Sequence, residues 1–209
     1  MTAAAPPGAA AGPRTADRVA RLLTEILSPA VLVATVLLAV AWHAADTPGQ
    51  ALLWGLIAAA AASFIPITYI IRGVRRGHWT DKHVGVREQR KLPLLVCLVS
   101  TAAGSVTLAV AGAPRELLAL IACMVAALVV AVAVTLAGRW KISVHSLVAA
   151  GTAIALVVVG GPALLATLPL AAAVGWSRVR LRDHTPAQVV AGAVVGACAT
   201  GLLFPALAS

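Results

Sequence analysis

Charged residues are scarce in this sequence. They make up 11% of the chain, whereas hydrophobic residues make up 61%, and the mean hydropathy is +0.97. A water-soluble domain of 209 residues needs far more polar surface, so this composition excludes one. A helix crosses the hydrocarbon core of a membrane with about 20 mainly apolar residues. The chain can therefore supply several crossings and has no room for a separate soluble domain.

Cysteine is also rare, and its spacing excludes the sites that cysteine usually builds. Cys97, Cys123 and Cys198 each lie inside an apolar stretch, and no two of them have the spacing of a metal site or a redox pair. We interpret them as small residues that face the core or the lipid. We expect neither a metal ion nor another cofactor.

Seven apolar runs dominate the chain, separated by polar residues, glycine or proline. They cover residues 23–43, 51–71, 92–112, 116–136, 143–160, 162–177 and 186–207. The sequence therefore predicts an all-α, polytopic transmembrane bundle of about six to seven spans, in a single domain over residues 22–209. The fifth and sixth runs are short, which leaves their crossing open.

The N-terminal end has a different composition. Residues 1–21 are rich in Ala, Pro and Gly and lack periodic apolar positions, which predicts a disordered tail. A cleaved signal peptide is the rival interpretation of this end. The apolar run that follows is longer than the apolar part of a signal peptide, so we do not expect cleavage.

The basic residues are distributed very unevenly. If every run crosses, 15 of the 16 Lys and Arg fall on one side, and only Arg115 falls on the other. By the positive-inside rule, the N-terminus and this face are cytoplasmic, in a bacterial plasma membrane. A phosphate site would also collect basic residues, but six arginines remain on this side without the candidate site residues. Because topology and site explain the charge, we expect the bilayer as partner and no nucleic acid; the oligomeric state is open.

Tryptophans lie near both ends of the predicted spans. This pattern indicates an aromatic belt at the two membrane interfaces. Those near the basic face are Trp79, Trp140 and Trp176, and Trp42 lies near the other face.

Residues able to do chemistry gather in three loops on the basic face: 80–93, 141–146 and 177–188. His145 and His184 each stand at a predicted helix start, where free N–H groups favour an anion. One imidazole can attack phosphorus while the other protonates the leaving alkoxide. Arginine forks and lysine can neutralise the phosphoryl oxygens. The candidates for this clamp are Lys82, Arg87, Arg90 and Arg178.

The three loops resemble the motifs of the type 2 phosphatidic acid phosphatase superfamily, which includes the vanadium haloperoxidases. Ser177-Arg178, five residues and then His184 reproduce its S-R-x5-H spacing. Ser143-Val144-His145 keeps the Ser and His of its P-S-G-H motif. Its K-x6-R-P motif is matched loosely by Lys82 and Arg90, with one extra residue between them. Gln188 stands where the family has an Asp that orients the nucleophilic histidine.

The resemblance implies a bundle of transmembrane helices and a metal-independent mechanism. His184 would form a phosphohistidine, His145 would protonate the leaving group, and Gln188 would orient His184 without the charge of the family Asp. Asp183 adjoins His184, but we do not expect it to replace that Asp. The phosphate would be bound by Arg178, Arg90, Lys82 and Ser143.

The resemblance also implies a lipid-phosphate substrate, such as phosphatidate, phosphatidylglycerol phosphate, or a polyprenyl phosphate or pyrophosphate. Two alternatives remain. A lipid-phosphate-binding protein with weakened or no catalysis is favoured by Gln188. A small transporter is disfavoured because the predicted spans carry almost no ionisable residue.

Overall fold

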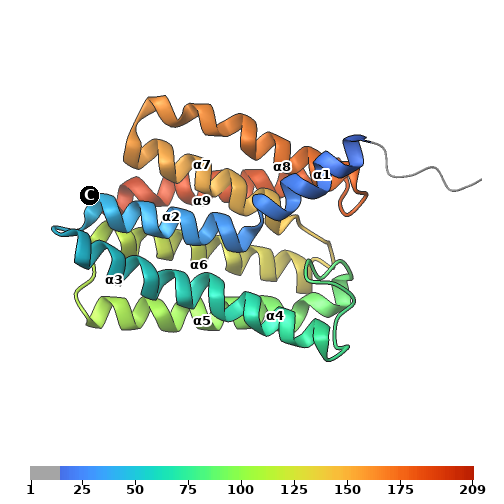
Figure 1. The fold of residues 1–209 in the computed structure, drawn as a ribbon, viewed down its shortest axis with the longest axis horizontal. Helices are drawn as coiled ribbons and strands as arrows, with labels where there is room; N and C mark the ends of the chain where they lie inside the picture. The colour runs from blue at the N-terminus through green and yellow to red at the C-terminus, as the bar shows by residue number, and fades with distance from the viewer. Residues whose placement is uncertain (1–14) are drawn as a thin grey trace, which may run out of the picture.

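The computed structural model describes residues 15–209, and every regular element in that range is helical (Figure 1). The prediction of an all-α chain is confirmed for these residues. The elements are α1 Thr15–Ile26, α2 Pro29–Ala44, α3 Pro48–Ala59, η1 Ala60–Phe64, α4 Ile65–Arg75, η2 Arg87–Arg90, α5 Lys91–Val110, α6 Arg115–Leu136, α7 Val144–Gly160, η3 Pro162–Thr167, α8 Leu168–Arg180 and α9 Pro186–Ala208.

Five helices in residues 15–209 are long and apolar enough to cross a membrane, or six if α1 and α2 form one bent span. The five are 48–75, 87–110, 115–136, 162–180 and 186–208. The remaining apolar helix, α7, has only 17 residues. The chain therefore has the helices of a membrane protein, and a seventh crossing by α7 stays a prediction.

The prediction of a disordered tail is wrong for residues 15–21, which belong to α1. The prolines and glycines of this region all precede Thr15, and residues 15–26 are mostly Ala, Leu, Arg and other helix formers. Polar contacts attach α1 to α8: Asp17 Oδ1 accepts from Arg180 Nε at 2.8 Å, and the Thr24 and Ser177 hydroxyls lie 3.0 Å apart. The remainder of the predicted tail, residues 1–14, lies outside the described residues.

Two prolines shape the first half of the bundle. Pro29 holds Ser28 in an extended conformation, so α1 and α2 meet at a bend of 44° within the run that the sequence predicts as one helix. Pro66 has no N–H to donate to the preceding turn. That turn, η1, is a π-helix in which the Ile65 N–H bonds the Ala60 carbonyl, and the Ser63 hydroxyl donates to Ala30 O at 2.7 Å.

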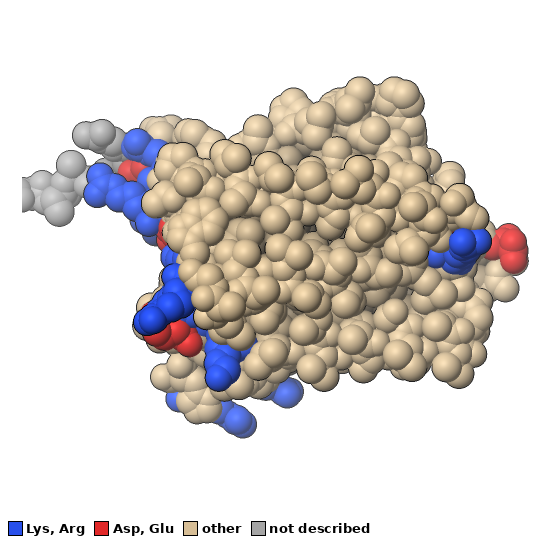
Figure 2. Space-filling view, turned by 180° about the vertical axis from the view of Figure 1, so that it is seen from behind, with Lys and Arg blue, Asp and Glu red and all other residues tan. Residues whose placement is uncertain are grey.

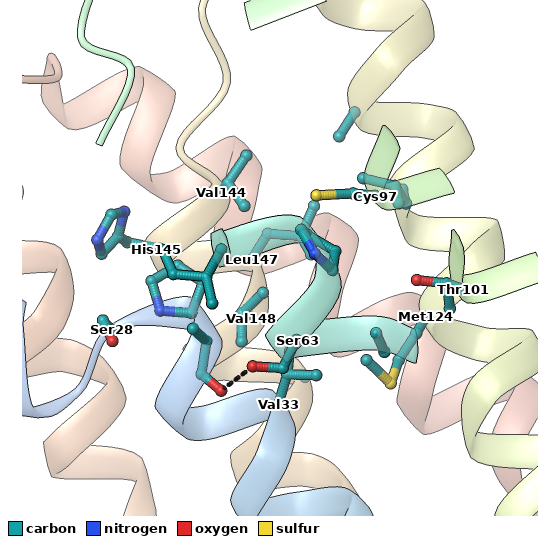
Figure 3. A pocket seen from close by; sticks show the side chains of 18 of the residues that line it. Ser28, Val33, Ser63, Cys97, Thr101, Met124, Val144, His145, Leu147 and Val148 are labelled. Atoms are coloured by element: carbon teal, nitrogen blue, oxygen red, sulfur yellow. Dashed lines mark hydrogen bonds between the residues drawn. The ribbon is translucent and has the colours of Figure 1, made fainter. Parts of the chain in front are cut away.

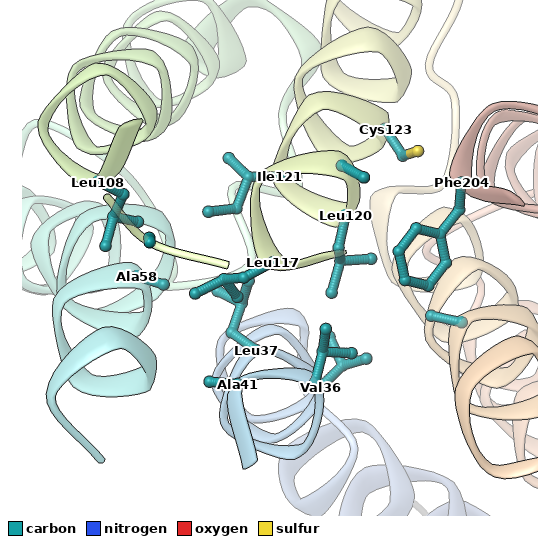
Figure 4. Packing of buried hydrophobic residues seen from close by; sticks show 14 of the residues in the cluster. Val36, Leu37, Ala41, Ala58, Leu108, Leu117, Leu120, Ile121, Cys123 and Phe204 are labelled. Carbon is teal, nitrogen blue, oxygen red and sulfur yellow. The ribbon is translucent and has the colours of Figure 1, made fainter. Parts of the chain in front are cut away.

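The core is a cluster of hydrophobic side chains between α2, α3, α5, α6, α7 and α9 (Figure 4). Leu37, Leu117 and Phe204 are almost completely buried within it. Beside this cluster α9 lies directly against α7, and glycine makes the approach possible. A Cβ at Gly192 would meet the Ser143 carbonyl oxygen at 2.4 Å, and one at Gly196 would meet Leu147 O at 2.0 Å.

The charged residues gather at one end of the bundle (Figure 2). This end carries the α4–α5, α6–α7 and α8–α9 connections, whereas the C-terminus lies at the opposite end (Figure 1). Trp42, Trp140 and Trp176 are exposed, as interfacial residues are. Trp79 differs from the predicted belt: it is buried, its ring packs over Gly73, and its centroid lies 5.2 Å from that of Tyr69.

Candidate functional site

His184 lies in the turn between α8 and α9 and is almost fully buried. Its Nδ1 is 3.1 Å from Gln188 Oε1. An amide oxygen only accepts hydrogen bonds, so this contact places the ring proton on Nδ1. The other ring nitrogen, Nε2, therefore carries a lone pair, which is the form that a nucleophilic histidine needs.

Gln188 also takes part in the capping box of α9, whose N-cap residue is Thr185. Its Oε1 accepts from the Thr185 N–H at 3.2 Å, while the Thr185 hydroxyl accepts from the Gln188 N–H at 3.4 Å. This reciprocal pair is a capping box, which favours Glu or Gln at the third helical position. Gln188 thus stabilises the first turn of α9 and orients His184 at the same time.

Arg90 links the first loop to the other two. Its Nε donates to Val84 O at 2.9 Å, and its Nη1 donates to Ile142 O at 3.0 Å. Its Nη2 lies 3.4 Å from His184 Nε2, the nitrogen with the lone pair. Arg90 is only 6% exposed, so its position is set by these contacts and not by solvent.

The backbone next to Arg90 is strained. Val84 has a φ of 48°, a conformation that a β-branched residue rarely adopts. This conformation directs the Val84 carbonyl at Arg90 Nε. Strain of this kind persists where surrounding contacts hold it, and it is concentrated at functional sites.

Arg178 lies at the end of α8 and is 1% exposed. Its Nη2 donates to Asp183 Oδ2 at 3.0 Å, and its Nη1 reaches the Thr24 hydroxyl at 3.5 Å. Its Nε has no hydrogen-bond partner among residues 15–209. A buried donor without a partner is costly, and an anion would supply one. Asp183 thus engages the arginine and does not take the place of Gln188 beside His184.

Lys141 joins the cluster, although the sequence analysis does not include it among the clamp residues. Its Nζ donates to Asp183 O at 2.7 Å. Burial lowers the pKa of His184 to about 3, and the nearby charges of Arg90, Lys141 and Arg178 contribute to that shift. Burial also lowers the pKa of Lys141, with Arg90 adding to the effect. A neutral imidazole therefore stands among three cationic side chains, an environment that attracts an anion.

The second loop is tied to the third through the backbone. The Ser143 N–H donates to Gln188 O at 3.2 Å, which holds the starts of α7 and α9 together. The Ser143 hydroxyl caps α7 by accepting from Ser146 N, and it also lies 3.0 Å from the Ser146 hydroxyl. In this structure Ser143 positions the helix that carries His145 and has its hydroxyl already engaged.

His145 faces a cavity of about 420 Å³ between α2, η1, α4, α5, α6, α7 and α9 (Figure 3). The imidazole is 6% exposed, and within the described chain its Nε2 has no hydrogen-bond partner. The His83 ring lies beside it, with centroids 5.3 Å apart. Arg90 lines the same cavity, whereas His184 and Arg178 do not. Arg90 therefore separates His184 from the cavity.

The other two predicted clamp residues have different surroundings. Lys82 lines the cavity but is half exposed and forms a salt bridge with Glu25 of α1. Arg87 donates to Glu88 at 2.6 Å and to Arg139 O at 3.0 Å at the exposed surface. The structure thus brings together Arg90, Arg178, His184 and Gln188, holds Lys82 at the cavity, and does not bring Arg87 to the cluster.

Comparisons with protein-family models, with curated proteins and with solved structures found no match to the chain. The resemblance to the phosphatase superfamily therefore depends on the motif residues alone. No three His, Cys, Asp or Glu side chains of residues 15–209 come together as metal ligands would. What the geometry offers is a neutral histidine, a second buried histidine and three cations, arranged beside a largely apolar cavity.

Proposed function

We propose that the protein is an integral-membrane lipid-phosphate phosphatase that acts through a phosphohistidine on His184. The observation that supports the proposal is the protonation state of His184 and the charge around it. Its Nδ1 proton is held by Gln188, and its Nε2 lone pair faces a cationic cluster. A neutral nucleophile beside cations suits attack on an anionic phosphoryl group, since the cations stabilise the charge on its oxygens.

The proposed reaction begins with an exchange at Arg90. A phosphoryl oxygen carries negative charge and binds a guanidinium more strongly than a neutral ring nitrogen does. Arg90 would therefore turn from His184 Nε2 to the phosphate, and the released Nε2 would form the N–P bond. The bond from phosphorus to the lipid oxygen breaks, and His145, which takes up a proton when the phosphate anion binds beside it, gives that proton to the leaving oxygen and later regains one from the attacking water. Water then cleaves the N–P bond and releases phosphate.

Gln188 limits this reaction. An Asp at its position would stabilise the positive imidazolium that forms as His184 becomes bonded to phosphorus, whereas an amide only orients the ring. We therefore expect slow turnover. A lipid-phosphate-binding protein without turnover is the second candidate, favoured by Gln188 and by the occupation of His184 Nε2 by Arg90.

The location of the reaction follows from the charge distribution. The positive-inside rule supports an orientation with the basic end of the bundle in the cytoplasm, and the membrane we propose is a bacterial plasma membrane. Substrates on the inner leaflet would reach the site there. Phosphatidate, phosphatidylglycerol phosphate and polyprenyl phosphates all carry the required group.

The test is phosphate release from a panel of these lipids by the purified protein in detergent. His184→Ala removes the nucleophile, so we expect activity to fall by about 10³-fold or more. Arg90→Ala should reduce kcat/KM by roughly 10²-fold, because one charged donor to the phosphate is lost. Arg87→Ala is the matched control: it removes an arginine of the same loop that lies outside the cluster, and activity should be retained.

Gln188→Asp separates the two candidate functions. A slow phosphatase should keep or gain activity in this variant. Absence of release by the native protein, with release gained in Gln188→Asp, would indicate a lipid-phosphate-binding protein. Equal activity in the native protein and His184→Ala would contradict the proposed mechanism.

A further inference from the structure

The cavity beside His145 has a polar end and an apolar interior. Its polar end is formed by Lys82, Arg90 and His145, at the charged end of the bundle. Its interior is lined mainly by aliphatic side chains and extends past Met124 of α6 and Thr200 of α9 (Figure 3). Along α6 it runs from Ala131 to Leu120, which at about 1.5 Å per residue is roughly 16 Å of helix.

The cavity opens sideways toward the apolar surface. Val31 of α2 and Ile71 of α4 both line it, and both are exposed. In a bundle that crosses a membrane, exposed aliphatic residues between two helices face lipid tails. A hydrocarbon chain could therefore enter between α2 and α4 without passing through water.

One buried polar group at this end has no partner in the described chain. His145 Nε2 is enclosed, faces the cavity and makes no hydrogen bond among residues 15–209. A buried polar atom of this kind requires explanation, and a ligand oxygen is one. Lys82 at this end is paired with Glu25, which also lines the cavity. Arg90 forms no salt bridge among residues 15–209, so an anionic oxygen is the matching group for Arg90 and His145 together.

The size of the cavity limits what it can hold. A small group such as a water or a methylene takes about 30 Å³ in a liquid. A cavity of about 420 Å³ therefore accommodates on the order of a dozen such groups. This is enough for most of one hydrocarbon chain.

We propose that this cavity binds one hydrocarbon chain of a lipid phosphate inside the helix bundle, with the phosphate against Arg90 and His145. The inference builds on the proposed function, because it assigns a substrate class to the same site. A single-chain phosphate fits with its whole chain enclosed. A diacyl lipid would place one chain in the cavity and leave its second chain in the bilayer.

The test is photo-crosslinking of the purified protein with a dodecyl phosphate that carries a diazirine at the far end of its chain. Mass spectrometry identifies the labelled peptides. We expect the label on the parts of α6, α7 and α9 near Met124, Thr152 and Thr200. Unlabelled dodecyl phosphate should compete with the probe at lower concentration than butyl phosphate does.

Two variants fill the inner part of the cavity and one matched variant does not. Thr152→Phe and Ala127→Phe both add a ring at a lining position, so each should reduce labelling at the interior peptides by roughly tenfold, about 1.4 kcal/mol. Val106→Phe adds the same ring at an exposed position of α5 outside the cavity and should leave labelling unchanged. Thermal melting identifies any variant that does not fold. If one filling variant does not fold, labelling of the other tests the proposal.

Hydrolysis of dodecyl phosphate is measured separately, so the two proposals can fail independently. Interior labelling without hydrolysis would retain the chain site and contradict the phosphatase. Hydrolysis with labelling confined to outward-facing residues, and unaffected by the filling variants, would contradict the chain site and retain the phosphatase.

Discussion

Gln188 combines two tasks at the start of α9. It completes the capping box of α9, and it holds the Nδ1 proton of His184. Glu is as suitable for a capping box as Gln. The side chain can therefore be given a charge, with its length and helix contacts retained.

The substitution Gln188→Glu should raise the pKa of His184. The pKa of this imidazole is now about 3, chiefly because of burial and nearby cations. A carboxylate in hydrogen-bond contact favours the imidazolium and typically changes a pKa by about 1–3 units. The measurement is NMR titration of the protein with labelled histidine. An unchanged His184 titration would contradict the contact with residue 188.

The low pKa of His184 in the native protein also makes its stability depend on pH. The folded pKa of His184 lies below that of an unfolded histidine, near 6.5. Between these values the unfolded chain binds more protons, so this residue reduces stability as pH falls from 6.5 toward 3. Gln188→Glu raises the folded pKa of His184 toward the unfolded value and so narrows the pH range in which stability is lost. The loss of stability on acidification should therefore be smaller in the variant.

Sequence spacing was sufficient to anticipate some of the site and not the rest. Arg178 at the end of α8 and His184 in the turn that follows are close in sequence, so their proximity is nearly local. The position of Lys141 depends on the turn before α9, where Arg182 has a φ of 59° and the Asp183 carbonyl faces Lys141 Nζ. The surface contacts that hold Arg87 away from the cluster involve Arg139, a residue of a distant loop.

At the scale of elements, the contact between α7 and α9 determines where the two histidines stand. These helices touch at Gly192 and Gly196, one turn apart on α9. Neither glycine can gain a side chain without contact with the backbone of α7. The starts of the two helices, which carry His145 and His184, depend on this approach.

Gly196→Ala should therefore destabilise the protein by about 1–3 kcal/mol, the usual cost of excess volume in a close contact. Its Cβ would lie 2.0 Å from Leu147 O. The measurement is the thermal unfolding midpoint in detergent.

Gly201→Ala is the matched control on the same helix. Its Cβ would have its nearest contact at 3.5 Å, with Ile154, which is an ordinary van der Waals distance. Alanine is also the better helix former, so this variant should be neutral or slightly more stable. Equal loss of stability in both variants would contradict the role given to Gly196.

The helices themselves were largely predictable, because an apolar run in so hydrophobic a chain has few other structures. Each of the seven runs contains a helix, and the errors concern helix ends and breaks. Residues 15–21 lie next to an Ala/Pro-rich segment but themselves contain no proline or glycine. The π-helical turn before Pro66 depends on how the chain adjusts to a missing N–H, which periodicity does not reveal.

At the scale of the molecule, the unequal distribution of charge is the strongest indication of orientation. We expect the basic end in the cytoplasm. Cysteine labelling in intact cells checks this: in a background without the native cysteines, a membrane-impermeant maleimide should label Gln50→Cys and not His78→Cys. Both positions are exposed: Gln50 lies in the first turn of α3 and His78 in the α4–α5 connection, and these lie at opposite ends of the bundle (Figure 1). The reverse pattern would place the proposed site on the outer face.

Because the cavity opens between α2 and α4, its occupancy depends on the concentration of ligand in the lipid phase and not on that in water. A ligand that enters from the lipid side is encountered by diffusion in two dimensions. Occupancy of the cavity would then follow the mole fraction of ligand in the bilayer or micelle, and adding inert detergent would dilute it even at constant total amount. Under the proposed function, the rate is a property of membrane composition as much as of the protein.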